Sequence, residues 1–528
     1  MDLLKRLRGR GQTYAFILGA VASLLVAGLL VPLVFGHPSS GLGSGATGLT
    51  VNGGRAGPSS GGPGVANSTG DTAATGGLDA APVPLTGTPG VGSGLQGSTI
   101  SPVGGGGTAL LGGASAPISP GGPTAGAGAG GRTASDQGVT ATTVRLGIEL
   151  VDFGGANTLG AGVAGYDTKA QKTYYDRFIN DVNAHGGAGG RQIEPHYYTV
   201  DILSPSTFTA ACNQLIDGDH VFAVTNVLGV YGDPILCVTR QHKTPYLAVD
   251  GAISAYYPAS QGLLFTVGPS TLRTISNMAF ELIRSGEIKG KTVGLLNEGE
   301  YLHDDFAALV DYLKSQNIKV VQQEIAAVDT SKAASQLPAA VQAFRAAGVN
   351  YVLLMTNSLY ASQFVQDAEP TGFPAYAESD FDYEMAGDSF LSQMPSDYFR
   401  HAVSITASRV GEYRLNLPEP APDHDCATVY GGGTPTPRSD TNYLNALAAC
   451  DLVRLFTTGF ARAGLNPTRQ TFAKAIASLG TVNLAAVGAA SFGPGKTDAP
   501  DAVRMDVAFA DCKCWKPQTG FVAAHFGG

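Results

Sequence analysis

The pattern of apolar positions divides the chain into three regions. Residues 14–35 are an unbroken run of 22 residues without a charge. A helix of that length spans about 33 Å, enough to cross the hydrocarbon core of a bilayer. Residues 37–137 have neither a helical nor a strand period. From residue 138, short apolar runs alternate with segments whose apolar residues recur at helical spacing, which is typical of a folded α/β protein.

Strands and helices alternate in two successive sets after residue 138. The first set predicts strands at 144–150, 193–200, 221–224 and 246–249, with helices at 168–184, 205–216 and 234–242. The second predicts strands at 292–296, 319–325, 351–355 and 375–378, with helices at 274–285, 306–316, 332–347 and 362–371. This order indicates parallel sheets covered by helices on both faces, arranged as two α/β lobes.

The N-terminal apolar run has the features of an export signal or a membrane anchor. Residues 1–12 carry Lys5, Arg6, Arg8 and Arg10 against a single acid, Asp2. Positive charge before the run predicts that 1–12 stays in the cytoplasm and that the rest is exported. The run is longer than the apolar core of a cleaved signal, which favours an uncleaved anchor over 13–36. Cleavage, with release to the periplasm or cell envelope, is the alternative. A lipid-anchored form would need a cysteine just after the run, and the first is Cys212.

Composition then explains the second region. Of the 72 glycines in the chain, 30 lie between residues 37 and 137. A segment this rich in Gly, Ala, Ser, Thr and Pro cannot bury enough apolar surface to fold, so 37–137 is predicted to be a disordered tether. A Gly-rich coil of about 100 residues has a mean span of roughly 50–60 Å. The net charge of −9 gives no basic footprint for nucleic acid.

Two segments of the third region resemble a known family. Residues 138–148, Gly-Val-Thr-Ala-Thr-Thr-Val-Arg-Leu-Gly-Ile, look like a characteristic first strand, and 178–191 contain the turn Asn-Ala-His-Gly-Gly-Ala-Gly-Gly-Arg after a helix. Both resemble the type I periplasmic solute-binding proteins of branched-chain amino-acid and amide ABC transporters. The order of later elements, through a strand at 504–510, is also similar.

The resemblance implies a fold of two Rossmann-like lobes joined by a hinge. Lobe 1 is expected to comprise 138–267 plus about 402–480, and lobe 2 is expected to comprise 268–401 plus about 481–528. The implied function is the extracytoplasmic solute-binding component of an ABC importer, whose lobes close on a small polar ligand such as an amino acid or amide. The implied partner is a membrane permease, and the head is expected to be monomeric. The alternative is a membrane-tethered sensor or envelope protein that uses the fold without transport.

The resemblance also implies which residues contact the ligand. Backbone N–H groups and hydroxyls at strand-to-helix turns would hold a carboxylate in lobe 1, and aromatic and acidic groups would come from lobe 2. The implied positions are Asp152, Phe153, Asn226, Leu228, Tyr231, Gly251, Ala252 and Ile253 in lobe 1, and Tyr301, Asn357, Ser358 and Asp380 in lobe 2.

Each of these assignments has a structural alternative. Asp380 aligns with an acid that binds the ligand ammonium in relatives, but it could also be a turn or cap residue. Asp152 could be a solvated loop acid, Tyr301 could pack on the lobe surface, and Gly251 and Ala252 suit any tight turn. The sequence departs from the relatives at Ile253, where they have Thr or Ser, and at Asn357 and Ser358, where they often have Tyr. The ligand can therefore differ from leucine or valine.

The six cysteines all follow the anchor and suggest disulfides, for which 15 pairings are possible. Cys212 and Cys237 lie on predicted helices that flank one strand, so their pairing is geometrically sensible. It would contribute about 3 kcal/mol by the chain-entropy model. Cys426 would pair with Cys450 and pin a Gly- and Pro-rich insertion at 417–438. Cys512 and Cys514 would form a tight pair or bind elsewhere; zinc is the rival, against which their spacing argues.

The motifs that could carry catalysis lack the necessary context. Residues 490–497 match a relaxed phosphate-loop pattern but precede a turn sequence where a helix is required. Glu298, Glu300, His303, Asp304 and Asp305 follow a strand and are predicted to be a solvated loop with a helix start; a hydrolytic carboxylate pair is the enzyme alternative. The protein is therefore expected to be neither an enzyme nor dependent on a cofactor or metal.

Overall fold

The computed structural model describes residues 131–155, 167–227, 229, 233–299, 302–326, 329–370, 372–380 and 387–525. The predicted anchor and nearly all of the predicted tether lie outside these residues. Within them, no helix is both long and apolar enough to span a bilayer. The last residues assigned to the tether are part of the folded head, because Thr133 donates its N–H to Asn466 Oδ1 at 2.9 Å and Asp136 Oδ2 accepts from Arg469 N at 2.7 Å.

The first sheet is fully parallel, as the pattern predicts, with strand order β2-β1-β3-β4-β5. Its strands are β1 (Thr143–Asp152), β2 (Gln192–Asp201), β3 (Ala223–Asn226), β4 (Tyr246–Ala248) and β5 (Leu264–Thr266). The sequence pattern missed β5, because three buried residues are too few to show a period.

The second sheet is mixed, whereas the sequence pattern indicated a parallel sheet. Its order is β14-β13-β10-β9-β8-β6-β7, with β15 paired to β13. The parallel strands are β6 (Thr292–Glu298), β7 (Lys319–Ile325), β8 (Tyr351–Met355), β9 (Tyr376–Ser379) and β10 (Ala402–Thr406). Antiparallel strands follow on the β10 side: β13 (Ala502–Phe509), β14 (Cys514–Pro517) and β15 (Val522–Ala523). A short link joins β13 to β14, and such a link permits only antiparallel pairing. Residues 402–406, assigned from the resemblance to lobe 1, thus belong to this second sheet.

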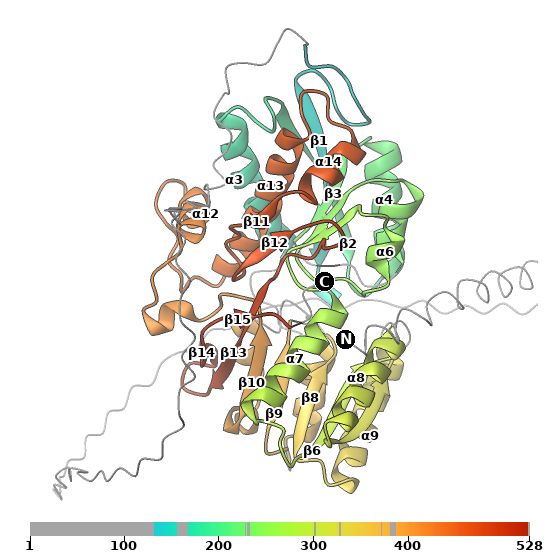
Figure 1. The fold of residues 1–528 in the computed structure, drawn as a ribbon, viewed down its shortest axis with the longest axis vertical. Helices are drawn as coiled ribbons and strands as arrows, with labels where there is room; N and C mark the ends of the chain where they lie inside the picture. Colours follow the sequence, from blue (N-terminus) through green and yellow to red (C-terminus); the bar gives the residue numbers. More distant parts are fainter. Residues whose placement is uncertain are drawn as a thin grey trace, which may run out of the picture. The chain divides into compact units, whose positions relative to one another are not determined.

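The second sheet is apolar on both faces, which the central strand β8 shows most directly. Tyr351, Leu353 and Met355 belong to one core cluster, together with residues of α7 (Thr271–Ser285) and α8 (His303–Ser315). Val352 and Leu354 belong to the other, with residues of α9 (Thr330–Ala346) and α10 (Ser358–Ala368). Helices therefore cover both faces, as buried parallel strands require (Figure 1).

The remaining helices correct several expected boundaries. The predicted helix at 205–216 is α4 (Pro205–Asn213), continued by a π-helix, η1 (Gln214–Gly218). The predicted helix at 234–242 is α5 (Pro234–Leu236), followed by a second π-helix, η2 (Cys237–Gln241). The Gly- and Pro-rich insertion contains a helix, α12 (Ala421–Tyr430). The other elements are α3 (Thr168–Ala184), α6 (Tyr256–Ala259), α11 (Asp388–Ser392), η4 (Ser396–Arg400), η5 (Glu412–Leu415), α13 (Tyr443–Arg462), α14 (Arg469–Ile476), β11 (Gly480–Val482) and β12 (Ala490–Phe492).

The helices α13 and α14 return to the first sheet, although they follow the second set of strands in the chain. Phe222, at the start of the β3 segment, makes edge-to-face contacts with Phe460 of α13 and Phe472 of α14, at centroid distances of 5.2 and 5.5 Å. Such aromatic pairs contribute about 0.5–1.5 kcal/mol each beyond the area they bury. The first lobe is thus completed by residues about 240 positions away in sequence.

The chain crosses between the two sheets three times, and the crossings are joined to one another. After β5, residues 267–270 lead to α7; after β10, residues 407–420 lead to α12; and residues 483–501 lead back to β13. Arg273 Nη1 lies 2.7 Å from Asp498 Oδ1, with the two side chains only 9% and 7% exposed. Asp498 Oδ2 also accepts from Ser270 N at 2.8 Å. A buried ion pair therefore ties the first crossing to the third.

The turn after α3 depends on glycine. Gly187 has φ +76°, and its N–H donates to Val182 O at 2.9 Å, which closes the C-terminus of the helix. A Cβ at Gly187 would lie 2.0 Å from Arg191 O, whereas a Cβ at Gly186, also at positive φ, would meet nothing within 4 Å. Substitution of Gly186 would therefore carry only the energetic cost of the backbone conformation, whereas substitution of Gly187 would add a steric clash with Arg191 O.

We expect Gly187→Ala to lower the free energy of unfolding by about 3–5 kcal/mol, because a left-handed residue and a displaced carbonyl both carry a cost. Gly186→Ala carries the conformational cost alone, about 1–2 kcal/mol. Urea unfolding followed by circular dichroism measures both. Equal losses for the two variants would contradict the close-approach argument.

We expect Arg273→Met to lower the free energy of unfolding by about 3–5 kcal/mol, because it leaves a buried carboxylate without its partner. The control is Lys172→Met, which breaks the Lys172–Asp176 pair, whose side chains are 47% and 38% exposed. Such a surface pair is worth about 0.3–0.5 kcal/mol. Double-mutant cycles with Asp498→Asn and Asp176→Asn give the two coupling energies, and similar values for both pairs would refute the special role of Arg273.

Candidate functional site

The predicted ligand residues that the structure describes lie at or just after the carboxyl ends of parallel strands. In the first sheet, Asp152 ends β1, Asn226 ends β3, and Gly251 follows β4 by a short turn. In the second sheet, Asn357 follows β8 and Asp380 follows β9. This is the edge at which α/β sheets bind ligands. Leu228, Tyr231 and Tyr301 lie outside the described residues.

A buried polar network fixes Asn226. Its Nδ2 donates to Glu149 Oε2 at 3.1 Å, and the hydroxyl of Tyr246 donates to the same oxygen at 2.8 Å. Glu149 and Asn226 are 1% and 0% exposed. Burial raises the pKa of Glu149 to about 7, against the hydrogen bonds from Tyr246 and Asn226, which lower it. Sequence reasoning missed Glu149, since an acid inside an apolar strand shows no pattern that separates it from a surface residue.

The turn after β4 is held by its backbone. A Cβ at Gly251 would lie 1.6 Å from Pro269 O. Only glycine therefore allows the turn after β4 to approach the first crossing this closely. Ala252 donates its N–H to the Tyr257 hydroxyl at 3.2 Å, and Ala252 O accepts from Thr271 N at 3.1 Å. Gly251 and Ala252 therefore have a structural role in joining the turn to the start of α7.

The other lobe-1 positions differ in their access to solvent. Asp152 is exposed, and its Oδ1 accepts from Gly154 N at 2.8 Å in a local turn. Phe153 and Ile253 are 4% and 8% exposed, so their side chains are mostly covered.

In the second sheet, Asn357 makes three hydrogen bonds that fix the turn after β8, two through its side chain and one through its backbone. Its Oδ1 accepts from Tyr360 N at 3.1 Å, which caps α10, and its Nδ2 donates to Glu298 Oε1 at 2.7 Å. The backbone N–H of Asn357 donates to the same Glu298 oxygen at 2.8 Å. Ser358 is the first residue of α10 and is half-buried.

The burial of Glu298 corrects the sequence prediction. Glu298 ends β6 and is 3% exposed, although the segment from 298 to 305 was expected to be a solvated loop with a helix start. His303 and Asp304 are exposed at the start of α8, as predicted. Glu298 instead joins the ends of β6 and β8, which the sequence could not show because the two strands pair only in the folded sheet.

Asp380 is also held in place by the fold. Its Oδ1 accepts from the Thr406 hydroxyl and its Oδ2 from Ala407 N, both at 2.5 Å. These contacts tie the end of β9 to the second crossing. Burial raises the pKa of Asp380 to about 6, partly offset by those hydrogen bonds and by the charge of Arg504. The carboxyl group of Asp380 is therefore fixed in orientation, and its raised pKa lies just below neutral pH.

A cluster of buried charged residues on β13 and η5 interacts electrostatically with Asp380. Arg504, 2% exposed, contacts Glu412 Oε1 at 2.9 Å and Asp506 Oδ1 at 2.9 Å. Burial raises the pKa of Asp506 to about 7, against the charge of Arg504. The cluster joins β13 to η5 and thereby fixes the second crossing against the second sheet.

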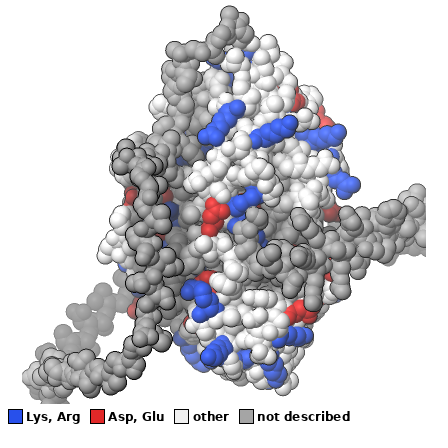
Figure 2. All heavy atoms as spheres, viewed as in Figure 1, with Lys and Arg blue, Asp and Glu red and all other residues white. Residues whose placement is uncertain are grey.

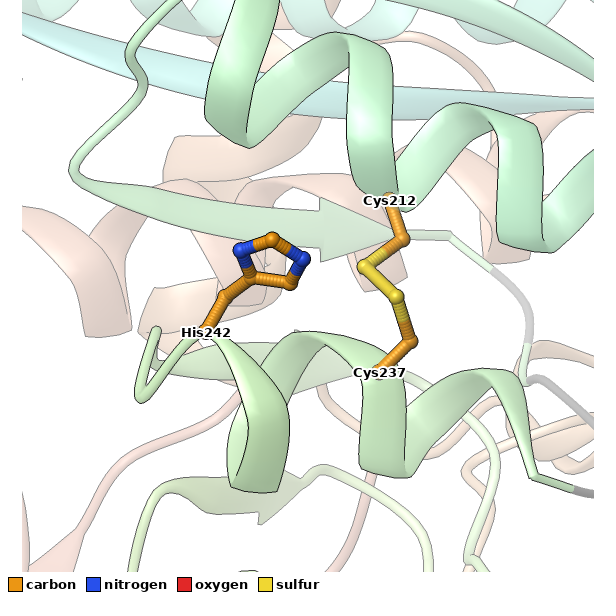
Figure 3. A group of neighbouring side chains, drawn as sticks. All are labelled: Cys212, Cys237 and His242. Carbon is orange, nitrogen blue, oxygen red and sulfur yellow. A yellow bond between two sulfur atoms is a disulfide. The ribbon is translucent and has the colours of Figure 1, made fainter.

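The described residues contain three disulfides, Cys212–Cys237, Cys426–Cys450 and Cys512–Cys514, so the last two cysteines form the tight pair. The first joins α4 to the start of η2, and the ring of His242 faces it (Figure 3). His242 Nδ1 lies 3.3 Å from Asp217 Oδ1. As a disulfide the two sulfurs carry no thiolate charge, so this group is a covalent link between helices that flank one strand.

The lysine of the phosphate-loop-like segment is used internally. Lys496 Nζ donates to the carbonyl oxygens of Ser491, Asp498 and Ala499, at 2.6, 2.6 and 2.8 Å. Gly493 and Lys496 form a tight turn after β12, within the segment that matches the phosphate-loop pattern. On the face that Figure 2 shows, Lys and Arg are scattered among uncharged residues, without a continuous basic stripe.

Comparison with known proteins agrees with this architecture. The family described as periplasmic binding protein matches residues 151–511, more than half of the chain. The chain belongs to the periplasmic binding protein family. Membership implies an extracytoplasmic head that binds a small molecule. No curated protein matched the chain.

Solved structures with the same fold have different ligands. A fatty acid ABC transporter substrate-binding protein from Thermomonospora curvata is 18% identical, with a TM-score of 0.56 over 74% of this chain and 95% of that one. A branched-chain amino acid transporter substrate-binding protein from Streptococcus pneumoniae, bound to isoleucine, is 16% identical, with a TM-score of 0.54 over 72% and 100%. A solute-binding protein from Rhodopseudomonas palustris, bound to 4-hydroxybenzoate, is 14% identical, with a TM-score of 0.56 over 72% and 97%. At these identities the likeness shows the fold alone.

We expect Glu149→Gln to change the pH dependence of stability. The folded pKa of Glu149 is raised to about 7 from 4.5, so the folded protein binds this proton more tightly than the unfolded chain. The wild type should therefore lose up to about 3 kcal/mol of stability relative to the variant as pH rises from about 4.5 to about 7. Both hydrogen bonds go to one oxygen, which the amide retains.

Urea unfolding of the wild type and the variant across pH 4–8 measures this difference. Glu194→Gln is the matched control on the neighbouring strand, since the Glu194 side chain is 43% exposed. If the difference in free energy of unfolding between the wild type and Glu149→Gln stays constant with pH, the pKa of Glu149 is not raised by folding.

Proposed function

We propose that this protein is the extracytoplasmic solute-binding component of an ABC importer. Family membership supports this role, and so does the position of the candidate residues at the carboxyl ends of strands in both sheets. Three crossings between the sheets provide the connection about which two lobes would close. The permease of such an importer would be the membrane partner.

The observation that carries the proposal is the orientation of Asp380. Hydrogen bonds from Thr406 and Ala407 fix its carboxylate at the end of β9, next to the second crossing. A carboxylate held in this way can bind an ammonium group without first paying for ordering its side chain. Turns of the first sheet would bind the ligand carboxylate through backbone N–H groups. The proposed ligand is therefore a small zwitterion, such as an amino acid, or an amide.

The alternative is a tethered sensor or envelope protein that binds the same ligand without transport. The long Gly-rich segment before the head favours this role. Reconstitution of the protein with an ABC permease from the same organism, followed by uptake of labelled ligand into vesicles, distinguishes the two functions.

The first test is a thermal-shift panel on the intact protein with leucine, isoleucine, an amide, 4-hydroxybenzoate and a fatty acid. A ligand that binds the folded form raises the melting temperature. If the ligand is an amino acid, Asp380→Asn should weaken its affinity at least about tenfold, because a charge-assisted hydrogen bond is lost. A carboxylic acid without an ammonium group should bind the variant and the wild type alike.

Isothermal titration gives the affinities, and Asp311→Asn, at an exposed position of α8, is the matched control. If no member of the panel binds while circular dichroism shows a folded protein, solute binding of this class is ruled out.

A further inference from the structure

The three disulfides differ in how accessible their sulfurs are. Cys212 and Cys237 are 0% and 4% exposed, and Cys426 and Cys450 are 0% and 2% exposed. In the third pair, Cys514 is 1% exposed, but Cys512 is exposed to solvent. Among the described cystines, therefore, Cys512–Cys514 is the one with a sulfur that a thiolate in solution can reach.

The local fold gives the two cysteines of this pair different surroundings. Cys514 begins β14 and pairs with Phe509 of β13, next to Trp515, which is 0% exposed. Cys512 lies in the turn between these strands. Lys513, between the two cysteines, has φ +45° and donates from Nζ to Ser392 O at 2.9 Å. One sulfur is thus held in the sheet while the other is presented on an anchored turn.

The pairs also differ in how strongly the fold protects them. A disulfide that stabilises a fold is stabilised by folding to the same extent, and in the chain-entropy model that extent grows with the length of the closed loop. The sequence separations are 25 and 24 residues for the buried pairs but only 2 for Cys512–Cys514. Folding therefore opposes reduction of Cys512–Cys514 least, and the head can remain folded when this bond is open. Exposed disulfides of this kind are the labile ones.

We propose that Cys512–Cys514 is a thiol–disulfide exchange site. A thiolate of an external dithiol attacks Sγ of Cys512, the sulfur–sulfur bond breaks, and Sγ of Cys514 leaves as a thiolate and takes up a proton. The second thiolate of the dithiol then attacks the dithiol sulfur that is bonded to Cys512. The mixed disulfide breaks, and Sγ of Cys512 leaves as a thiolate and takes up a proton. The dithiol is oxidised to a disulfide, and the cysteine pair receives its two electrons.

The dithiol can come from a low-mass compound or from a cysteine-containing peptide. Phe509, which pairs with Cys514 across the sheet, is 39% exposed. A peptide can use this exposed ring as an apolar contact beside the disulfide. The shared chemistry is attack by a thiolate on Cys512.

The first experiment treats the intact, oxidised protein with dithiothreitol without denaturant, alkylates free thiols at intervals and locates them by mass spectrometry. Cys512 and Cys514 should become labelled at least about 100-fold faster than the other four cysteines, with unchanged circular dichroism. Similar rates for all three disulfides would overturn the proposal.

A second arm mixes the oxidised protein with a reduced peptide that contains two cysteines. One equivalent of oxidised peptide per protein supports exchange with polypeptides, whereas reduction by dithiothreitol alone supports exchange with low-mass dithiols. The control is the double variant Cys512→Ser, Cys514→Ser, and peptide oxidation at an equal rate by that variant would refute a role for the pair.

Single variants test the asymmetry independently. Cys514→Ser leaves the exposed thiol and should react with an aromatic disulfide reagent at least about tenfold faster than Cys512→Ser, which leaves the buried thiol. The reverse order would show that Cys512 is not the sulfur that is attacked.

Discussion

The buried ion pair between Arg273 and Asp498 is the interaction on which the arrangement of the two sheets depends. The first sheet is completed by helices that lie in the chain between β10 and β13 of the second sheet, so three segments must cross between the sheets. Arg273 stands at the start of the first crossing's helix and Asp498 in the third crossing. Because the pair is almost fully buried, either partner alone would be an uncompensated charge, which makes the joined crossings strongly preferred over separated ones.

The same use of charge recurs at the carboxyl ends of the strands. Glu149 holds Asn226, Glu298 holds Asn357, and Asp380 holds the start of the second crossing. These acids take up backbone and amide donors that would otherwise be unpaired where the strands end. Part of the polar chemistry expected for a ligand is thus committed to the scaffold. Specificity is then left to the backbone N–H groups at the strand ends and to the remaining acceptor capacity of Asp380, whose two oxygens each already accept one hydrogen bond.

The sequence was most informative where elements are long and periodic. The helix at 168–184 and the strand β7 have the predicted bounds, and so does β8, whose five consecutive residues are all apolar or aromatic. The strands β5 and β10 were missed, because β5 has only three residues and β10 interrupts its apolar residues with Ser404 and Thr406. Candidate site residues could be placed at strand ends, but their partners could not. The role of Glu298 depends on the pairing of β6 with β8, whose partner residues are 58 positions apart, and no local pattern encodes that contact.

The polar turn after β8 has a physical explanation in this network. The Asn357 side chain both caps α10 and donates to Glu298, which a ring without an amide could not do in the same way. Glu298 Oε1 also accepts from the Thr356 hydroxyl and from Asn357 N, so the amide adds a third donor to this buried carboxylate. The turn after β8 is therefore fixed by polar contacts. A ligand at this edge would therefore meet a smaller, more polar surface than a tyrosine provides.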